Sequence, residues 1–216
     1  MPEQLGLFGE TEDQEARKPV KVDSGPRVQF FDLETKKSAE DVGGWDNIHE
    51  MEMTVGVVWD SLDQEFFTYE EKDVAQLVEK LRTADLVVGF NILRFDYTVL
   101  QPYLRKLHLD FDLKEEINTF DMLDDIYELL HFRLSLKHLA QHTLGEDKLD
   151  GAESGLYALE LYKNGEIGKL IKYCQKDVEI TRDLFLFGEK HDFVKYQSRS
   201  GKPLQLEVDW KTANLT

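Results

Sequence analysis

Acidic residues recur in three short segments that lie far apart in the chain. Asp32 and Glu34 follow an apolar run, residues 28–31, and are two positions apart, so on an extended chain both side chains point to the same face. Asp96 ends a segment that begins in a second apolar run, and Asp177 lies much further on. Carboxylates that meet inside a fold repel one another unless a cation lies between them. Oxygen ligands of this kind suit Mg²⁺ or Mn²⁺, so the pattern predicts a site for two divalent ions, which is an apparatus for cutting phosphodiesters.

Tyr173 and Asp177 are four residues apart, which stacks their side chains one turn apart on one face of a helix. Each segment also has a simpler explanation when it is taken alone. Asp96 at the start of a helix would serve as a cap or as a partner of the helix dipole, and a tyrosine beside an aspartate would form a structural hydrogen bond. The metal site is favoured because the simpler explanations need three independent coincidences.

Three further residues near these acids are candidates for contacts with nucleic acid. Arg94 lies in the segment that leads to Asp96 and could hold a phosphate, although an ordinary surface arginine explains it equally well. Asn91 lies at the same turn, where its side chain would otherwise bond to local backbone. Trp45 follows the glycines at 43–44 and could stack on an unpaired base, with ordinary packing as its alternative.

The balance of charge argues against purely electrostatic binding of nucleic acid. The chain has 26 basic and 43 acidic residues and a formal charge of −17. Such a protein repels phosphates at long range. We therefore expect either that it does not bind nucleic acid, or that bound metal ions and a second attachment compensate for the repulsion.

Cysteine usage and hydropathy place the chain in the cytoplasm. The single cysteine, Cys174, excludes an internal disulfide framework, suits a reducing compartment, and is expected to be a buried thiol. No apolar run approaches the ~20 residues of a membrane span, and the N-terminus lacks the features of a secretion signal. A membrane role is not expected.

Residues 1–26 differ in composition from the rest of the chain. They are polar, acidic and rich in charge, so they are predicted to form a flexible tail, followed by one domain over residues 27–216. One apolar island interrupts the tail: Gln4, Leu5, Leu7 and Phe8. Exposed apolar side chains on such a tail predict a docking segment, although packing on the chain's own domain would also explain them.

Periodicity over the remaining residues alternates between strand and helix. Strands are predicted at residues 28–32, 51–59, 65–69, 86–90 and 117–121, with an edge strand at 204–210. Helices are predicted at residues 71–84, 96–107, 122–131, 135–143, 154–163 and 166–188. This order indicates a mixed α/β domain with one sheet flanked by helices.

Other polar groups are weaker candidates. His138 and His142 have a spacing compatible with zinc on a helix, but no further ligand completes a site, so packing or solvent exposure is favoured. Asp121 ends a predicted strand near the acidic segments and could support the site indirectly. Asp124 and Asp125 follow it at a helix start, where the helix dipole favours acids.

The three acidic segments resemble the three exonuclease motifs of the DEDD family, in the subclass with tyrosine in the third motif. Asp32 and Glu34 match the first motif and Asp96 the second, while Asp177 with Tyr173 matches the third. The resemblance covers roughly residues 28–188. It implies a ribonuclease H-like fold and 3′-to-5′ removal of nucleotides, with the four carboxylates holding two Mg²⁺ or Mn²⁺ ions. Tyr173 would orient the water or the scissile phosphate.

The apolar island resembles the short motif with which bacterial replication and repair proteins bind the sliding clamp. Gln4, Leu5, Leu7 and Phe8 match it, and Gly6 fills a variable position. The resemblance implies a clamp-tethered exonuclease that acts on single-stranded DNA or RNA ends in replication or repair and is nucleoid-associated through the clamp. The alternatives are an RNA-specific ribonuclease at the replication fork, a non-catalytic binding module recruited by the clamp, and an endonuclease of the same fold.

Overall fold

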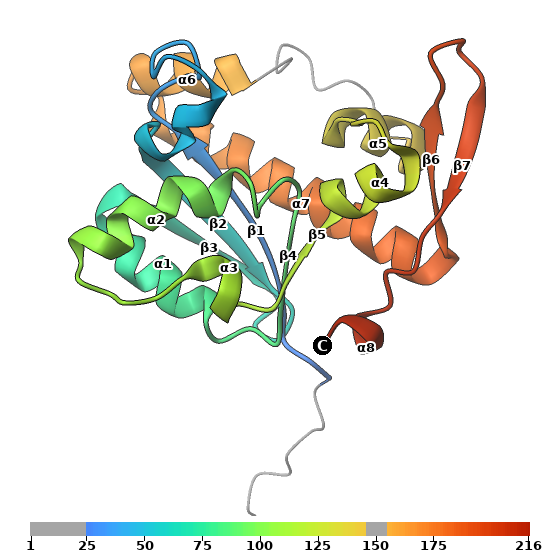
Figure 1. Ribbon diagram of the computed structural model, residues 1–216, viewed down its shortest axis with the longest axis horizontal. Coiled ribbons are helices and arrows are strands. Elements are labelled where there is room, and N and C mark those ends of the chain that lie inside the picture. The colour runs from blue at the N-terminus through green and yellow to red at the C-terminus, as the bar shows by residue number, and fades with distance from the viewer. Residues whose placement is uncertain (1–24, 146–154) are drawn as a thin grey trace, which may run out of the picture.

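The computed structural model describes residues 25–145 and 155–216 (Figure 1). The strands of the main sheet are β1 (Val28–Thr35), β2 (Met53–Asp60), β3 (Glu65–Glu70), β4 (Leu86–Gly89) and β5 (Thr119–Asp121). Their order across the sheet is β3-β2-β1-β4-β5. β1, β2 and β3 pair antiparallel, whereas β4 and β5 run parallel to β1. The predicted mixed sheet is therefore confirmed.

Helices connect and cover these strands. The short 3-10 helices are η1 (Trp45–Glu50) and η2 (Glu71–Asp73). The α-helices are α1 (Val74–Leu81), α2 (Asp96–Lys106), α3 (Leu113–Glu116), α4 (Met122–Leu130), α5 (Leu136–Thr143), α6 (Gly155–Lys163), α7 (Ile167–His191) and α8 (Thr212–Leu215). Ser135 caps α5, because its hydroxyl accepts a hydrogen bond from the His138 backbone N–H.

The alternation of side chains along β1 divides the core into two layers. Val28 and Phe30 pack in the cluster that contains α7, whereas Phe31 and Leu33 pack in the cluster that contains α1 and α2. α7 accordingly covers one face of the sheet, and α1 and α2 cover the other (Figure 1). Burial of a side chain of this size contributes roughly 1.5–3 kcal/mol, so a register shift of one residue in β1 would be costly.

Residues after α7 form a second, two-stranded sheet, which corrects the prediction of a single sheet with an edge strand at 204–210. β6 (Phe193–Gln197) and β7 (Pro203–Glu207) pair with each other and stand beside the main sheet (Figure 1). The Thr143 hydroxyl lies 2.9 Å from the Lys195 backbone N and 3.0 Å from its backbone O. These bonds attach β6 to α5.

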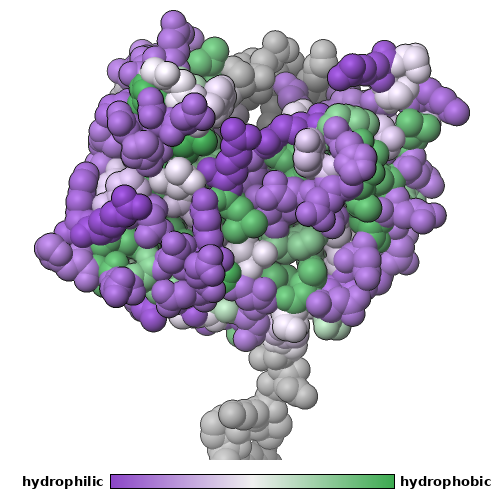
Figure 2. Space-filling model, viewed as in Figure 1, coloured by the Kyte–Doolittle hydropathy of each residue, from purple (hydrophilic) through white to green (hydrophobic). Residues whose placement is uncertain are grey.

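Hydrophilic side chains cover most of the face shown in Figure 2, with smaller apolar patches between them. Within the two described ranges, no helix is both long enough and apolar enough to span a membrane. The predicted clamp-binding residues Gln4, Leu5, Leu7 and Phe8 lie outside the described residues, as does almost all of the predicted tail, so this division of the chain stays a prediction.

Candidate metal centre

The carboxyl ends of the three parallel strands meet at one edge of the sheet, and an acidic residue lies at or just beyond each end. Glu34 lies near the end of β1, Asp96 follows β4 by a short loop and begins α2, and Asp121 ends β5. Open α/β sheets place their ligand sites at this edge. The topology thus brings together acidic segments that the sequence separates widely.

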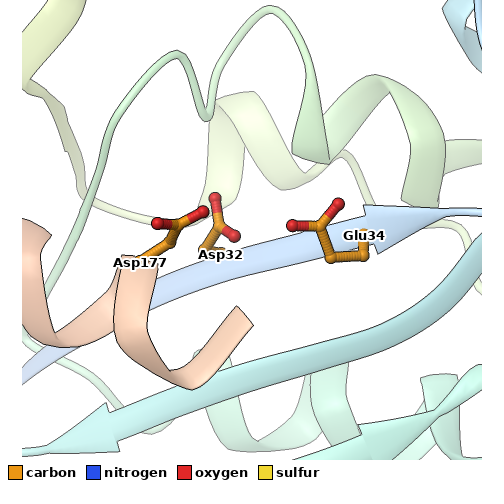
Figure 3. Close-up of side chains that lie close together, drawn as sticks. All are labelled: Asp32, Glu34 and Asp177. Carbon is orange, nitrogen blue, oxygen red and sulfur yellow. The ribbon is translucent and has the colours of Figure 1, made fainter. Parts of the chain in front are cut away.

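Asp32 and Glu34 point to the sheet face that α7 covers, the same face as Phe30, because side chains alternate along β1. Asp177 projects from α7 toward them (Figure 3). One carboxylate oxygen from each of Asp32, Glu34 and Asp177 lies within 4.8 Å of the others, and all three residues are half-buried. This trio could hold a metal ion.

Asp96 lies next to this trio but is fixed differently. It is 2 % exposed, and its Oδ1 accepts a hydrogen bond from the Leu33 backbone N–H at 3.0 Å. It lines the same cavity as the trio. The structure therefore brings all four predicted carboxylates to one site, with Asp96 held against the strand that carries Asp32 and Glu34.

Burial and mutual repulsion raise the pKa values of the four carboxyl groups. The pKa values of Asp32, Glu34 and Asp96 are well above the ordinary range, first because the groups are buried and then because negative neighbours disfavour ionisation. Burial raises the pKa of Asp177 to about 7, although a hydrogen bond from Tyr173 and the charge of Lys176 act in the opposite direction. Cations at this site would replace protons as the neutralising charge.

Tyr173 lines the cavity between the acids and α6. Burial, followed by the charge of Asp177, raises the pKa of the Tyr173 phenol far above its ordinary value. The phenol is therefore protonated at neutral pH and serves as a hydrogen-bond donor. Its ring meets the ring of Tyr157 edge-on at a centroid distance of 5.7 Å, which limits its movement.

The acids open onto a cavity of about 490 Å³, large enough for a nucleotide. Aromatic and aliphatic side chains form much of its wall, among them Trp45, Phe90, Phe95, Leu156 and Leu159. A pocket with acids at one end and aromatic walls elsewhere offers a charged centre for phosphate chemistry and flat surfaces for a base.

The three residues predicted to contact nucleic acid are divided between two cavities. Trp45 lines the cavity of the acids, whereas Asn91 and Arg94 line a neighbouring cavity that Trp45 also reaches. Arg133, which has no distinguishing sequence context, joins them there, and its Nη2 donates to Asn91 Oδ1 at 2.6 Å. Sequence reasoning missed Arg133 because only the tertiary fold places it beside Asn91.

Asp121 supports the site through the loop that follows β4. Its carboxylate accepts backbone hydrogen bonds from Asn91 at 2.8 Å and from Leu93 and Leu123 at 3.0 Å. Asp121 is 4 % exposed, so these bonds are shielded from water. The position of Asp121 at a strand end indicated an indirect role, and the structure shows what it contacts.

Cys174 and the histidine pair agree with their simpler explanations. Cys174 is fully buried, and its Sγ lies 3.4 Å from the Asp32 backbone O. The rings of His138 and His142 lie 4.5 Å apart, and His138 Nε2 accepts a hydrogen bond from the Gln197 backbone N–H. His138 thus attaches the β6–β7 hairpin to α5. In the part of the chain that is described, the only acid, cysteine or histidine group suited to a metal is the Asp32–Glu34–Asp177 trio.

The fold and this acidic edge define an RNase H-like nuclease domain. A model of the RNase H superfamily matches residues 29–186, and the chain belongs to that superfamily. No curated protein matches the chain. A solved structure of the family B DNA polymerase from the hyperthermophilic archaeon Pyrobaculum calidifontis aligns with a TM-score of 0.55 and 17% identity, over 76% of this chain and 25% of the polymerase. At this identity the likeness supports the fold, and this chain spans about a quarter of that polymerase.

Proposed function

We propose that this protein is a metal-dependent 3′–5′ exonuclease of the subclass with a motif tyrosine, acting on single-stranded DNA or RNA ends. One observation carries the proposal: Asp32, Glu34, Asp96, Tyr173 and Asp177 line one cavity, although the chain separates them widely. This is the residue set that the three motif resemblances imply. Retention of the whole set argues against a binding module that has lost its chemistry.

The donor set fits divalent metal ions. Three carboxylate oxygens lie within 4.8 Å of one another, and hard oxygen ligands are those that Mg²⁺ and Mn²⁺ prefer. The hydrogen-bond partner of Asp32 Oδ2 is the weak donor Cys174 Sγ, at 3.7 Å. A half-buried acid with so weak a donor is suited to a cation. We propose that Asp32, Glu34, Asp96 and Asp177 hold two such ions.

The metal ions would supply positive charge that activates a water and stabilises the departing 3′ oxygen. The chain's own residues do the rest. The aromatic walls of the cavity bind the terminal nucleotide and exclude bulk water. The single O–H of the neutral Tyr173 phenol donates to Asp177 in this structure. When Asp177 holds a metal ion, the same O–H would turn to orient the water or the scissile phosphate, and the raised pKa of the phenol makes it unsuited to act as the base.

Labelled oligonucleotides test the reaction. With Mg²⁺ or Mn²⁺, a 5′-labelled strand should give a ladder of shortened products, and a 3′-labelled strand should release labelled mononucleotide; a chelator should stop both. Internal cuts would contradict exonuclease action, and intact strands under all conditions would contradict catalysis. DNA and RNA versions of the same strand show which sugar is accepted, because the sequence does not reveal a residue that recognises the 2′-hydroxyl.

Substitutions connect the activity to the site. Asp32→Asn and Asp177→Asn should each reduce cleavage to background and weaken Mn²⁺ binding in a titration, because each removes a ligand. Glu40→Gln is the matched control, since Glu40 is an exposed acid that lines the same cavity outside the trio. Full activity in both aspartate variants would contradict the assignment.

A further inference from the structure

A second cavity, of about 330 Å³, adjoins the cavity of the metal centre. It is lined by Trp45, Ile48, Asn91, Arg94 and Arg133, which we call the arginine pocket. Trp45 belongs to the lining of both cavities. The loop after β4 separates them.

That loop presents different chemistry to its two sides. Phe90 and Phe95 line the cavity of the metal centre, whereas Asn91 and Arg94 line the arginine pocket. A flexible polymer with one end at the carboxylates could therefore continue past Trp45 and over this loop into the arginine pocket.

The two arginines of the arginine pocket form no ion pair with any described residue. In contrast to Arg27, Arg82 and Arg182, which form ion pairs, Arg94 and Arg133 have no carboxylate partner among residues 25–145 and 155–216. Both are exposed. In a chain with a formal charge of −17, two guanidinium groups in one cavity, neither in an ion pair with a described residue, form a local site for an anion. Guanidinium groups bind phosphate oxygens with two parallel hydrogen bonds.

Asn91 holds Arg133 in place without neutralising it. The bond from Arg133 Nη2 to Asn91 Oδ1 is 2.6 Å, and its acceptor is an uncharged amide. Asn91 itself has a left-handed backbone with φ 70, a conformation that asparagine tolerates better than most residues. Its N–H is held by Asp121. Asn91, in the loop after β4, thus orients the guanidinium group of Arg133.

Trp45 supplies a flat surface at the junction of the two cavities. Its side chain is 62% exposed, and its ring lies 6.5 Å from the ring of Phe95. An exposed indole beside arginines is the combination with which proteins bind single-stranded nucleic acid, through base stacking and phosphate contacts.

We propose that the arginine pocket is the subsite for the strand upstream of the cleaved bond. Arg94 and Arg133 bind a backbone phosphate of that strand, Asn91 positions Arg133, and Trp45 stacks on a base where the strand passes between the two cavities. This inference rests on the proposed exonuclease function and assigns the place of the remaining strand. Its ligand is single-stranded nucleic acid, DNA or RNA.

Binding measurements test the site directly. In the cleavage-inactive Asp177→Asn protein, the affinity for a fluorescent oligothymidylate is measured by anisotropy, with an oligouridylate in parallel. Arg94→Ala and Arg133→Ala should each weaken binding roughly five- to tenfold, because each removes a charge-assisted hydrogen bond at an exposed site. The slope of log affinity against log salt should fall by about 0.7 for each phosphate that a variant no longer binds. Arg199→Ala is the matched control, because Arg199 is exposed in the β6–β7 turn.

Two substitutions of Asn91 test its positioning role. Asn91→Gly permits the left-handed backbone but removes Oδ1, so it should weaken binding of the oligonucleotide by about the same factor as Arg133→Ala. The protein with both substitutions, Asn91→Gly and Arg133→Ala, should bind no more weakly than either single variant. Asn91→Asp gives Arg133 a charged partner and should weaken binding of the oligonucleotide while leaving the loop intact.

A small substrate separates this inference from the proposed function. The p-nitrophenyl ester of thymidine 5′-monophosphate has a scissile phosphate but no upstream strand, so Arg94→Ala and Arg133→Ala should hydrolyse it like wild type while the KM for an oligonucleotide rises. If wild type cleaves both substrates and the arginine variants bind and cleave the oligonucleotide as Arg199→Ala does, the subsite assignment is wrong and the proposed nuclease function is retained. If wild type cleaves neither substrate, the nuclease function is wrong and the subsite with it.

Discussion

Asp121 shows how a buried carboxylate outside the acidic trio can position a residue of the candidate metal centre. Two of the backbone hydrogen bonds that it accepts, from Asn91 and Leu93, hold the loop that leads from β4 to Asp96, and the third, from Leu123, caps α4. Gly89 is the last residue of β4, just before this loop, and is packed so closely on Ile92 that a Cβ at residue 89 would lie 2.6 Å from the Cβ of Ile92. The loop that Asp121 holds therefore positions Asp96.

Asp121→Asn should reduce the affinity for Mn²⁺ by roughly 10–100-fold, the usual effect of losing a group that orients a metal ligand. The amide can accept through one oxygen only, so at least one loop N–H loses its partner. Titration of Mn²⁺ followed by electron paramagnetic resonance measures the affinity. Asp124→Asn is the control, because Asp124 is an exposed acid one turn further on. Unchanged affinity in Asp121→Asn would show that the loop does not depend on this carboxylate.

The carboxylate cluster also predicts how the metal-free protein responds to pH. The pKa of Asp177 is about 7 in the folded protein, against an ordinary value of 3.8. Between these values the folded state binds a proton that the unfolded state does not, so the free energy of unfolding decreases as pH rises. This stabilisation is complete below the ordinary pKa and is lost as pH rises through about 7.

The thermal midpoint of the metal-free protein should therefore decrease as the pH is raised from about 5.5 to about 8. The decrease should be smaller in Asp177→Asn, which lacks the titrating group. Differential scanning calorimetry with a chelator measures both proteins. Added Mn²⁺ should raise the midpoint of wild type most at the higher pH, because the metal binds the deprotonated acids. An equal fall in wild type and Asp177→Asn would contradict the raised pKa.

At the scale of elements, α7 joins the metal centre to the C-terminal part of the chain. Its early turns carry Tyr173 and Asp177, and its late turns pack against Trp210. Trp210 is fully buried and stacks on Phe185 at an interplanar angle of 4°. A Cβ at residue 188 would lie 2.3 Å from a Trp210 ring carbon, so this close crossing requires glycine. The segment after the hairpin thus fixes the helix that carries Asp177, one of the proposed metal ligands.

Trp210→Ala should lower the free energy of unfolding by about 3–5 kcal/mol, the usual cost of removing a buried large aromatic side chain. It also leaves Asp125 without the indole N–H that donates to it at 2.8 Å. Urea unfolding followed by circular dichroism measures the change. Trp45→Ala, at an exposed position, should cost little. If the two substitutions cost the same, the C-terminal segment does not stabilise α7.

At the scale of the whole molecule, the negative charge of the protein opposes binding of a nucleic acid at the proposed nuclease site. A formal charge of −17 repels a phosphodiester chain, and hydrophilic groups dominate the face in Figure 2. The arginine pocket is a local exception, and we propose that the tail is the second attachment. A tether through residues 4–8 to a sliding clamp would hold the domain near nucleic acid at an effective concentration on the order of millimolar.

Leu7→Ala with Phe8→Ala should abolish binding to a purified bacterial sliding clamp in isothermal titration calorimetry, because these side chains would fill the apolar pocket of the partner. Gln4→Ala should weaken it. Cleavage of a short free oligonucleotide should not change in either protein. Glu10→Ala, in the same tail outside the motif, is the control. Clamp affinity that survives the double substitution would exclude the tether.

Much of the site can be predicted from local pattern alone. The alternation along residues 28–34 puts Asp32 and Glu34 on one face, and the interval of four puts Tyr173 and Asp177 on one helix face; the structure has both arrangements. The predicted boundaries of most strands and helices lie within a few residues of those in the structure. These properties follow from the periods of strand and helix, which are local.

Sequence by itself determined which residues carry the carboxylates, their spacing within each element, and the alternating order of strands and helices. Tertiary structure alone decided that Asp121 anchors the loop before Asp96, that Arg133 meets Asn91, and that the hairpin after α7 attaches to α5. The physical reason is the range of the interactions. Backbone periodicity acts over a few residues, whereas these contacts join positions 30 to 52 residues apart, and they form only when packing has chosen the neighbours of each strand.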